Sequence, residues 1–449
     1  MKRSLLLSTL LLSLYSLASI TNGSIEFYND NEHSFYSKKN SLKITDLGFR
    51  TNITKNGLTI GTNLKFDDFY PQTSDKDDTF SNFINNSKIY AKYEKSFGDT
   101  TTSLKISFNP NMTKNQEDKN VLIGDIKVRG KVELTHNDLT AGFSSKTVFP
   151  FKNCDQDTCP KYGTNVFSKH DLYLNGDTEY IKDIDTKLEL YNSYSDTSDS
   201  LKYLSTAFSA SYSPIDNLKL DIASNFKYQF NDDLDFEDIY TGTKRFTDKI
   251  DDYLTNNTDF CLYQKDASYF QSHNLGIEYT GLDKFDFKIN NYVNHLKCKN
   301  VYGIKNALSY GDEFNTTYTP IDNLTLTAYT HLGGVSLLGE SHKPLNIGLF
   351  EINLGTKYDY YPIDEITLSP SLNVATYFGV TKSTFDLAKL AAAPTLELDP
   401  RLEFDYTLIN KLNITASAET PITFTILKDN KFGFHDANIK TSLDIKYEW

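Results

Sequence analysis

The C-terminal end of the chain alternates between apolar and polar side chains with a period of two residues. From Ala437 to Trp449 the odd positions carry Ala, Ile, Thr, Leu, Ile, Tyr and Trp, whereas the even positions carry Asn, Lys, Ser, Asp, Lys and Glu. This alternation is typical of a β-strand with one apolar face and one wet face. A tilted strand crosses the hydrocarbon core of a bilayer with about 9–11 residues. The segment is therefore long enough to span a membrane, although a strand of a soluble sandwich would alternate in the same way.

The strand ends on Trp449, which is the only tryptophan of the chain. It resembles the last strand of Gram-negative outer-membrane β-barrel proteins, which alternates apolar residues and closes on a C-terminal Phe or Trp. The resemblance implies that Leu443, Ile445, Tyr447 and Trp449 form an insertion signal read by the barrel-assembly machinery. It also implies residence in the outer membrane of a diderm bacterium, in contact with lipid and lipopolysaccharide, and a homotrimer is one expected assembly.

The N-terminal residues have the organisation of a secretory signal peptide. Lys2 and Arg3 precede an apolar core from Leu5 to Leu17, and small residues follow it. We expect residues 1–23 to be removed, with cleavage after Ala18 or after Gly23, which leaves 24–449 as a single domain. An uncleaved anchor helix is the less favoured alternative. No other apolar run is long enough to span a membrane as a helix, so the mature chain would have to span it with strands.

A tight hairpin recurs along the chain and alternates with long polar connections. The stretch from Tyr212 to Leu220 (YSPIDNLKL) returns from Tyr318 as YTPIDNLTL and from Tyr360 as YYPIDEITL. Proline presets the turn and Asp or Asn closes it. Nine such turns give eighteen strands, the C-terminal strand is the nineteenth, and an even-numbered barrel requires a first strand near 24–36. The sequence thus predicts an all-β, transmembrane, antiparallel up-and-down barrel of about 18–20 strands, with short periplasmic turns and long extracellular loops.

The composition fits a wide barrel and argues against some partners. Mean hydropathy is only −0.46, which is compatible with a barrel in which alternate residues line a polar lumen. The 30 Tyr and 30 Phe suit aromatic girdles at the membrane interfaces. A formal charge of −13 argues against nucleic acid as a partner.

The four cysteines are expected to form disulfides, because an even number follows an export signal. Cys154 and Cys159 lie in one short polar stretch and are expected to pair with each other. Cys261 and Cys298 remain as the second pair, which would link two extracellular loops.

Motifs of catalysis are lacking in the sequence. It contains no glycine-rich phosphate loop, no HExxH and no GxSxG elbow. We therefore expect neither an enzyme nor a cofactor or metal site.

Charged residues on the expected lumen positions form two groups. The basic group comprises Lys65, Lys88, Lys92, Lys105, Lys127, Arg129 and Lys131. The second group, mainly acidic, comprises Glu397, Asp399, Arg401, Glu403 and Asp405. If these groups face each other they create a transverse field, although charges on a wet face also occur without any function.

These observations predict a porin, a passive channel for small hydrophilic solutes or ions with weak selectivity. The long acidic loop from Asn231 to Tyr269 is a candidate constriction, as in the porins that the chain resembles. An outer-membrane adhesin or receptor, whose loops bind a partner, is the alternative.

Overall fold

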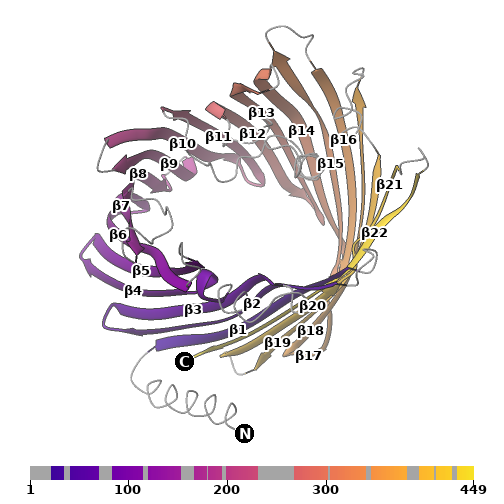
Figure 1. Cartoon of the computed structure of the whole chain (residues 1–449). Coiled ribbons are helices and arrows are strands. Elements are labelled where there is room, and N and C mark those ends of the chain that lie inside the picture. Colours follow the sequence, from indigo (N-terminus) through magenta and orange to yellow (C-terminus); the bar gives the residue numbers. More distant parts are fainter. Residues whose placement is uncertain are drawn as a thin grey trace.

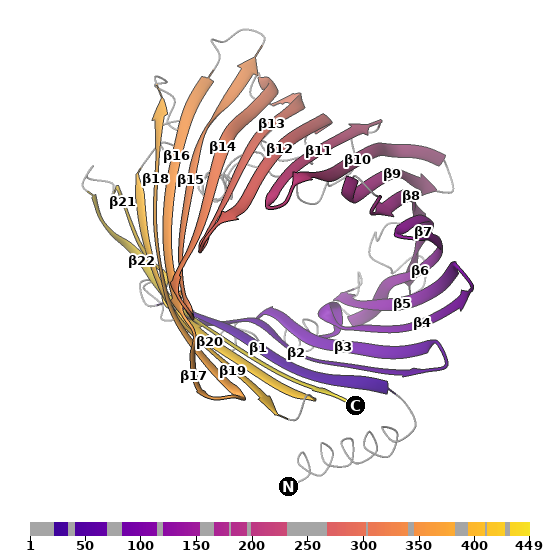
Figure 2. The same ribbon diagram turned by 180° about the vertical axis from the view of Figure 1, so that it is seen from behind.

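The strands of the computed structural model form one closed antiparallel ring (Figures 1 and 2). The structure describes residues 22–34, 41–69, 83–114, 120–152, 166–178, 181–194, 199–230, 267–301, 304–339, 345–381, 394–408, 411–426 and 432–449. Within these ranges the helical residues are a single turn over 83–86, and no helix is long and apolar enough to cross a membrane.

Twenty-two strand segments make up the ring. They are β1 (Asn22–Ser34), β2 (Ser41–Lys55), β3 (Leu58–Phe69), β4 (Lys88–Phe97), β5 (Thr100–Lys114), β6 (Asn120–His136), β7 (Leu139–Lys152), β8 (Val166–Gly176), β9 (Ile181–Tyr194), β10 (Asp199–Ile215), β11 (Leu218–Gln229), β12 (Ala267–Leu282), β13 (Phe285–Val301), β14 (Ile304–Ile321), β15 (Leu324–Gly339), β16 (Leu345–Tyr358), β17 (Tyr360–Ile363), β18 (Ile366–Thr381), β19 (Thr395–Leu408), β20 (Leu412–Glu419), β21 (Ile422–Ile426) and β22 (Phe432–Glu448).

Two pairs of these segments are interrupted single strands, so the barrel has twenty. β17 continues β16 after Asp359, and both pair with β18. β20 and β21 both lie between β19 and β22. Sequential neighbours pair throughout, and β1 closes the ring against β22. The up-and-down barrel is confirmed, with twenty strands rather than eighteen.

The recurring turn is built as its sequence suggests. Ile215 pairs with Leu218 around a two-residue turn, and the register shifts between Tyr212 and Ile215. Pro214 falls in this bulge, where its missing N–H interrupts no ladder hydrogen bond. Asn217 closes the turn with a φ of 67°, a conformation that Asn tolerates better than most residues. The same arrangement recurs at Asn323, whose φ is 71°.

The two faces of the sheet differ in chemistry and in exposure. One face carries large exposed apolar side chains such as Ile60 (57 % exposed) and Val380 (68 %). The other carries crowded and mostly polar side chains such as Ser144, which is 2 % exposed. On a closed barrel the concave side is the crowded one, so the polar face is the inner face and the apolar face is directed at lipid. The inner face turns apolar on β15–β18, where Val335, Ile347 and Tyr377 are buried.

The seam between the first and last strands carries the predicted insertion signal. Leu443, Ile445 and Tyr447 lie on β22 opposite β1, on the apolar face. The backbone N–H of Trp449 donates to the carbonyl oxygen of Gly23 at 3.1 Å, and the N–H of Gly23 donates in return at 3.3 Å. The indole occupies the space beside Gly23 that a Cβ atom would need. The first strand, expected near 24–36, begins at Asn22.

Several strands extend further into the expected loops than the sequence suggested, because polar residues continue the ladder beyond the apolar band. β12 begins at Ala267, so Tyr269 belongs to a strand and not to the preceding loop. Our placement of Cys298 in a loop is wrong, since it lies in β13 opposite Ala267. Outside the described residues lie residues 1–21 of the predicted signal peptide, the loop residues 231–266, Cys154, Cys159 and Cys261. The signal peptide and both disulfides therefore stay predictions.

Candidate functional site: the charged inner face

All of the residues expected to line a pore share the inner face with Tyr28. Residues directly opposite each other on paired strands have their side chains on the same face of the sheet. Lys65 lies opposite Gly48, which lies opposite Tyr28. In the same way, Asp405 lies opposite Thr415, Thr415 opposite Asp444, and Asp444 opposite Tyr28. The remaining candidates follow at two-residue intervals or directly across the ladder. These are Lys88, Lys92, Lys105, Lys127, Arg129, Lys131, Glu397, Asp399, Arg401 and Glu403. Whether they line a conducting pore stays a prediction.

The basic group divides into paired and unpaired cations. Lys65 lies 3.6 Å from Asp46, Lys92 lies 2.5 Å from Glu94, and Lys131 lies 2.6 Å from Glu133. The other four, Lys88, Lys105, Lys127 and Arg129, have no acidic partner within the described part of the chain; we call them the basic quartet. Their strands, β4, β5 and β6, are consecutive. A cation-rich arc with little internal neutralisation therefore occupies one part of the inner face.

Three inner-face cations lie over tyrosine rings, and each ring in turn covers a glycine. Arg50 stacks on Tyr28 at 4.1 Å, Lys105 on Tyr90 at 4.5 Å and Lys131 on Tyr173 at 5.5 Å, measured to the ring centroids. Directly across the ladder from these tyrosines lie Gly48, Gly61 and Gly142. Each ring fills the space that a Cβ atom would need. The glycines thus let the tyrosine rings lie against the inner face of the sheet, and the rings hold the cations above them by cation–π contacts.

One carboxylate of the acidic group on β19, Glu403, contacts neighbouring cations, and so does Glu419 on β20. Arg401 contacts Glu403 at 2.5 Å and Glu419 at 3.7 Å. Lys357 contacts Glu403 at 3.3 Å, and Lys440 contacts Glu419 at 3.3 Å. The inner face of the barrel at β19 and β20 is therefore less negative than the number of its carboxylates suggests.

The two charged groups do not lie diametrically opposite each other. Around the twenty-strand ring, β5 and β19 are seven steps apart through β1, whereas ten steps would set them opposite. In Figure 1 β1, β2 and β3 lie between β4 and the arc that holds β19. Any field between the two groups would therefore cross the lumen obliquely and not along a diameter of the ring, and its existence stays a prediction.

An ion-pair network on β8 and β9, whose carboxylates are buried and whose lysines are partly exposed, was missed by the sequence analysis. Glu189 contacts Lys169 at 2.5 Å and Lys187 at 2.7 Å, and Lys187 lies 3.7 Å from Asp171. Asp171 also accepts a 3.0 Å hydrogen bond from Ser144. Alternation of Leu with charged residues over 187–190 was the available signal for this network.

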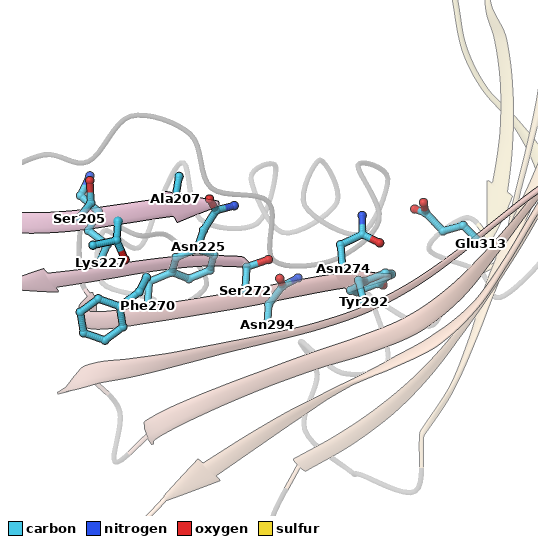
Figure 3. Close-up of a pocket in the computed structure, with 12 residues that line it drawn as sticks. Ser205, Ala207, Asn225, Lys227, Phe270, Ser272, Asn274, Tyr292, Asn294 and Glu313 are labelled. Carbon is cyan, nitrogen blue, oxygen red and sulfur yellow. The ribbon is translucent and has the colours of Figure 1, made fainter. Parts of the chain in front are cut away.

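A second inner-face feature is a hollow over β10–β14 that is lined by polar and aromatic side chains (Figure 3). Its lining includes Asn225, Ser272, Asn274 and Asn294, and Figure 3 shows these side chains on the same side of their strands. Phe270 and Tyr292 lie among these amides and hydroxyls, and the lining contains one cation, Lys227, and one carboxylate, Glu313, so this arc lacks the excess of positive charge of the basic quartet.

The closed ring, its even strand number, the polar inner face and the apolar outer face define a transmembrane β-barrel of the outer-membrane type.

No family model matches the chain, and no curated protein matches it. Several solved structures of outer-membrane proteins match the chain at low sequence identity. The outer membrane channel DcaP of Acinetobacter baumannii is 10 % identical with a TM-score of 0.41, over 96 % of this chain and 97 % of that one. Outer-membrane expressed OmpT of Vibrio cholerae is 11 % identical with a TM-score of 0.36, over 96 % and 97 %. The copper transporter OprC is 9 % identical with a TM-score of 0.45, over 96 % and 80 %. Likeness at these levels concerns the fold and does not extend to substrates.

Proposed function

We propose that the protein is a porin, a passive diffusion channel of the outer membrane for small hydrophilic solutes, and that it is not an enzyme. The observation that carries the proposal is the charged inner face of a closed twenty-strand barrel. Barrels of about 16–18 strands already leave an aqueous channel. Side chains such as those of the basic quartet are costly to hold away from water, so a hydrated lumen accounts for their position.

The charge distribution supports a preference for anions. The quartet has no acidic partners among the described residues, whereas Glu403 and Glu419 on the other arc contact Arg401, Lys357 and Lys440. An unpaired cation attracts a permeating ion more strongly than a paired carboxylate does. We therefore expect anion selectivity, partly offset by Asp399 and Asp405, which have no ion pair in the described part of the chain.

Planar bilayer recording on refolded protein tests this proposal. We expect stepwise conductance in KCl and, across a salt gradient, a reversal potential of the sign set by chloride permeation. The selectivity should grow as salt is lowered, because the Debye length rises from about 3 Å at 1 M to about 30 Å at 0.01 M. A correctly folded barrel without conductance would contradict the proposal and favour a barrel that anchors binding loops.

A further inference from the structure

The basic quartet is placed where like charges oppose one another. Lys105 lies directly across the ladder from Arg129, and Lys127 is two residues from Arg129 on the same face. Lys88 repels Lys105 and Lys127, and Lys105 also repels Lys92 and Arg129. Like charges directly opposite each other on a sheet are destabilising. The fold therefore retains an arrangement that opposes its own stability.

The repulsion is not due to a shortage of carboxylates. The chain has 59 acidic residues against 46 Lys and Arg. Elsewhere on the inner face lysines are matched with acids, as in Lys187 with Glu189, Lys357 with Glu403 and Lys440 with Glu419. Within the described residues the quartet itself therefore lacks ion-pair partners, whereas the neighbouring Lys92 and Lys131 on the same strands pair with Glu94 and Glu133.

The quartet and its surroundings suit an oxyanion with more than one charge. The Arg129 guanidinium offers a planar fork of N–H donors, which matches phosphate and carboxylate oxygens. Lys105 extends over the Tyr90 ring, which holds its ammonium at a defined position. Side chains that are directly opposite across an antiparallel pair have Cβ atoms about 4.5–5.5 Å apart. One polyanion can therefore contact Lys105 and Arg129 together and reduce the repulsion between them.

We propose that the basic quartet is a binding site for small multiply charged oxyanions, such as phosphorylated or polycarboxylate solutes, on the inner wall of the barrel. The inference rests on the proposed function, because a solute reaches this wall through the lumen. A singly charged anion neutralises one cation and leaves the repulsion among the others, whereas a polyanion relieves several repulsions at once. The site thus prefers pyrophosphate to chloride.

The test uses the full refolded chain in planar bilayers, with pyrophosphate and, in a separate arm, citrate added to a KCl solution. We expect both to reduce chloride current in a concentration-dependent manner. The variant K105Q/K127Q/R129Q should weaken this block by about tenfold or more, since each lost contact is a charge-assisted hydrogen bond. The matched control K288Q/K357Q/K440Q removes the same charge from inner-face positions with acidic partners and should retain the block.

The outcomes separate this inference from the proposed function. Conductance that neither polyanion reduces, or an equal block in both variants, overturns the binding site and leaves the channel intact. Block by pyrophosphate but not by citrate restricts the site to phosphorylated solutes and supports it in that form. If the barrel does not conduct, the proposed function fails. Isothermal titration of the detergent-solubilised protein with pyrophosphate then tests binding at the site independently of conductance. Equal binding heats for the wild type and the K105Q/K127Q/R129Q variant, or no binding heat for either, overturn the binding site.

Discussion

Removing the carboxylate of Glu189 tests whether the inner-face ion pairs stabilise the barrel. The Glu189 side chain is 8 % exposed, and it contacts both Lys169 and Lys187. In Glu189→Gln both lysines lose their nearest negative charge. Breaking a fully buried pair costs about 3–5 kcal/mol. The lysine side chains are 32 % and 38 % exposed and can turn to water, so we expect a smaller loss of about 1–2 kcal/mol in the free energy of unfolding.

Urea unfolding of the refolded barrel in detergent, followed by the heat-modifiable shift on gels, measures this loss. Glu94→Gln is the matched control, because Glu94 pairs with Lys92 on the same face but is 48 % exposed. It should change stability by less than about 0.5 kcal/mol. If both variants unfold at the same urea concentration, the β8–β9 network contributes no more than a surface pair and our reasoning fails. The Glu189 variant should also conduct with increased anion selectivity, since it adds unpaired positive charge to the wall.

Three further outcomes follow from the fold. Deleting Trp449, or the strand from Ala437, should prevent insertion but not export, because an unclosed sheet leaves backbone groups unsatisfied in lipid; normal amounts of heat-modifiable protein in the outer membrane would contradict it. Gly142→Val should lower stability, since Tyr173 occupies the Cβ space, and Gly130→Val, with open space at its Cβ, is the control for unfolding in urea. Non-reducing peptide mapping should find Cys154 linked to Cys159 and Cys261 linked to Cys298, whereas free thiols in exported protein would refute both disulfides.

The strand number was predictable only to within two, as 18 or 20, and it was predictable because short turns leave strong local signals. The first strand was weakly patterned, and the even number of strands in a barrel led to it rather than its own residues. Period-two alternation was equally sufficient to put Lys105 and Arg129 on one face. Such predictions depend only on positions near in sequence or on the closure of the sheet.

Charge pairing was not predictable, because it depends on register between strands. A shift of one residue moves every side chain of a strand to the other face. Bulges such as the one between Asp30 and Asn31 alter the pairing locally and leave no reliable mark in the sequence. The apolar inner positions Val335 and Ile347 were also missed, since alternation disappears where both faces of a strand are apolar.

The glycines beneath the tyrosine rings connect side-chain size to electrical behaviour. A methyl group at Gly61 would collide with the Tyr90 ring, which would have to tilt away from the wall. Lys105 lies on that ring and would move with it, so the height of a positive charge above the wall would change without any change in charged residues. Natural variants that differ only at such glycines are therefore expected to differ in ion preference, and their formal charge would give no indication of it.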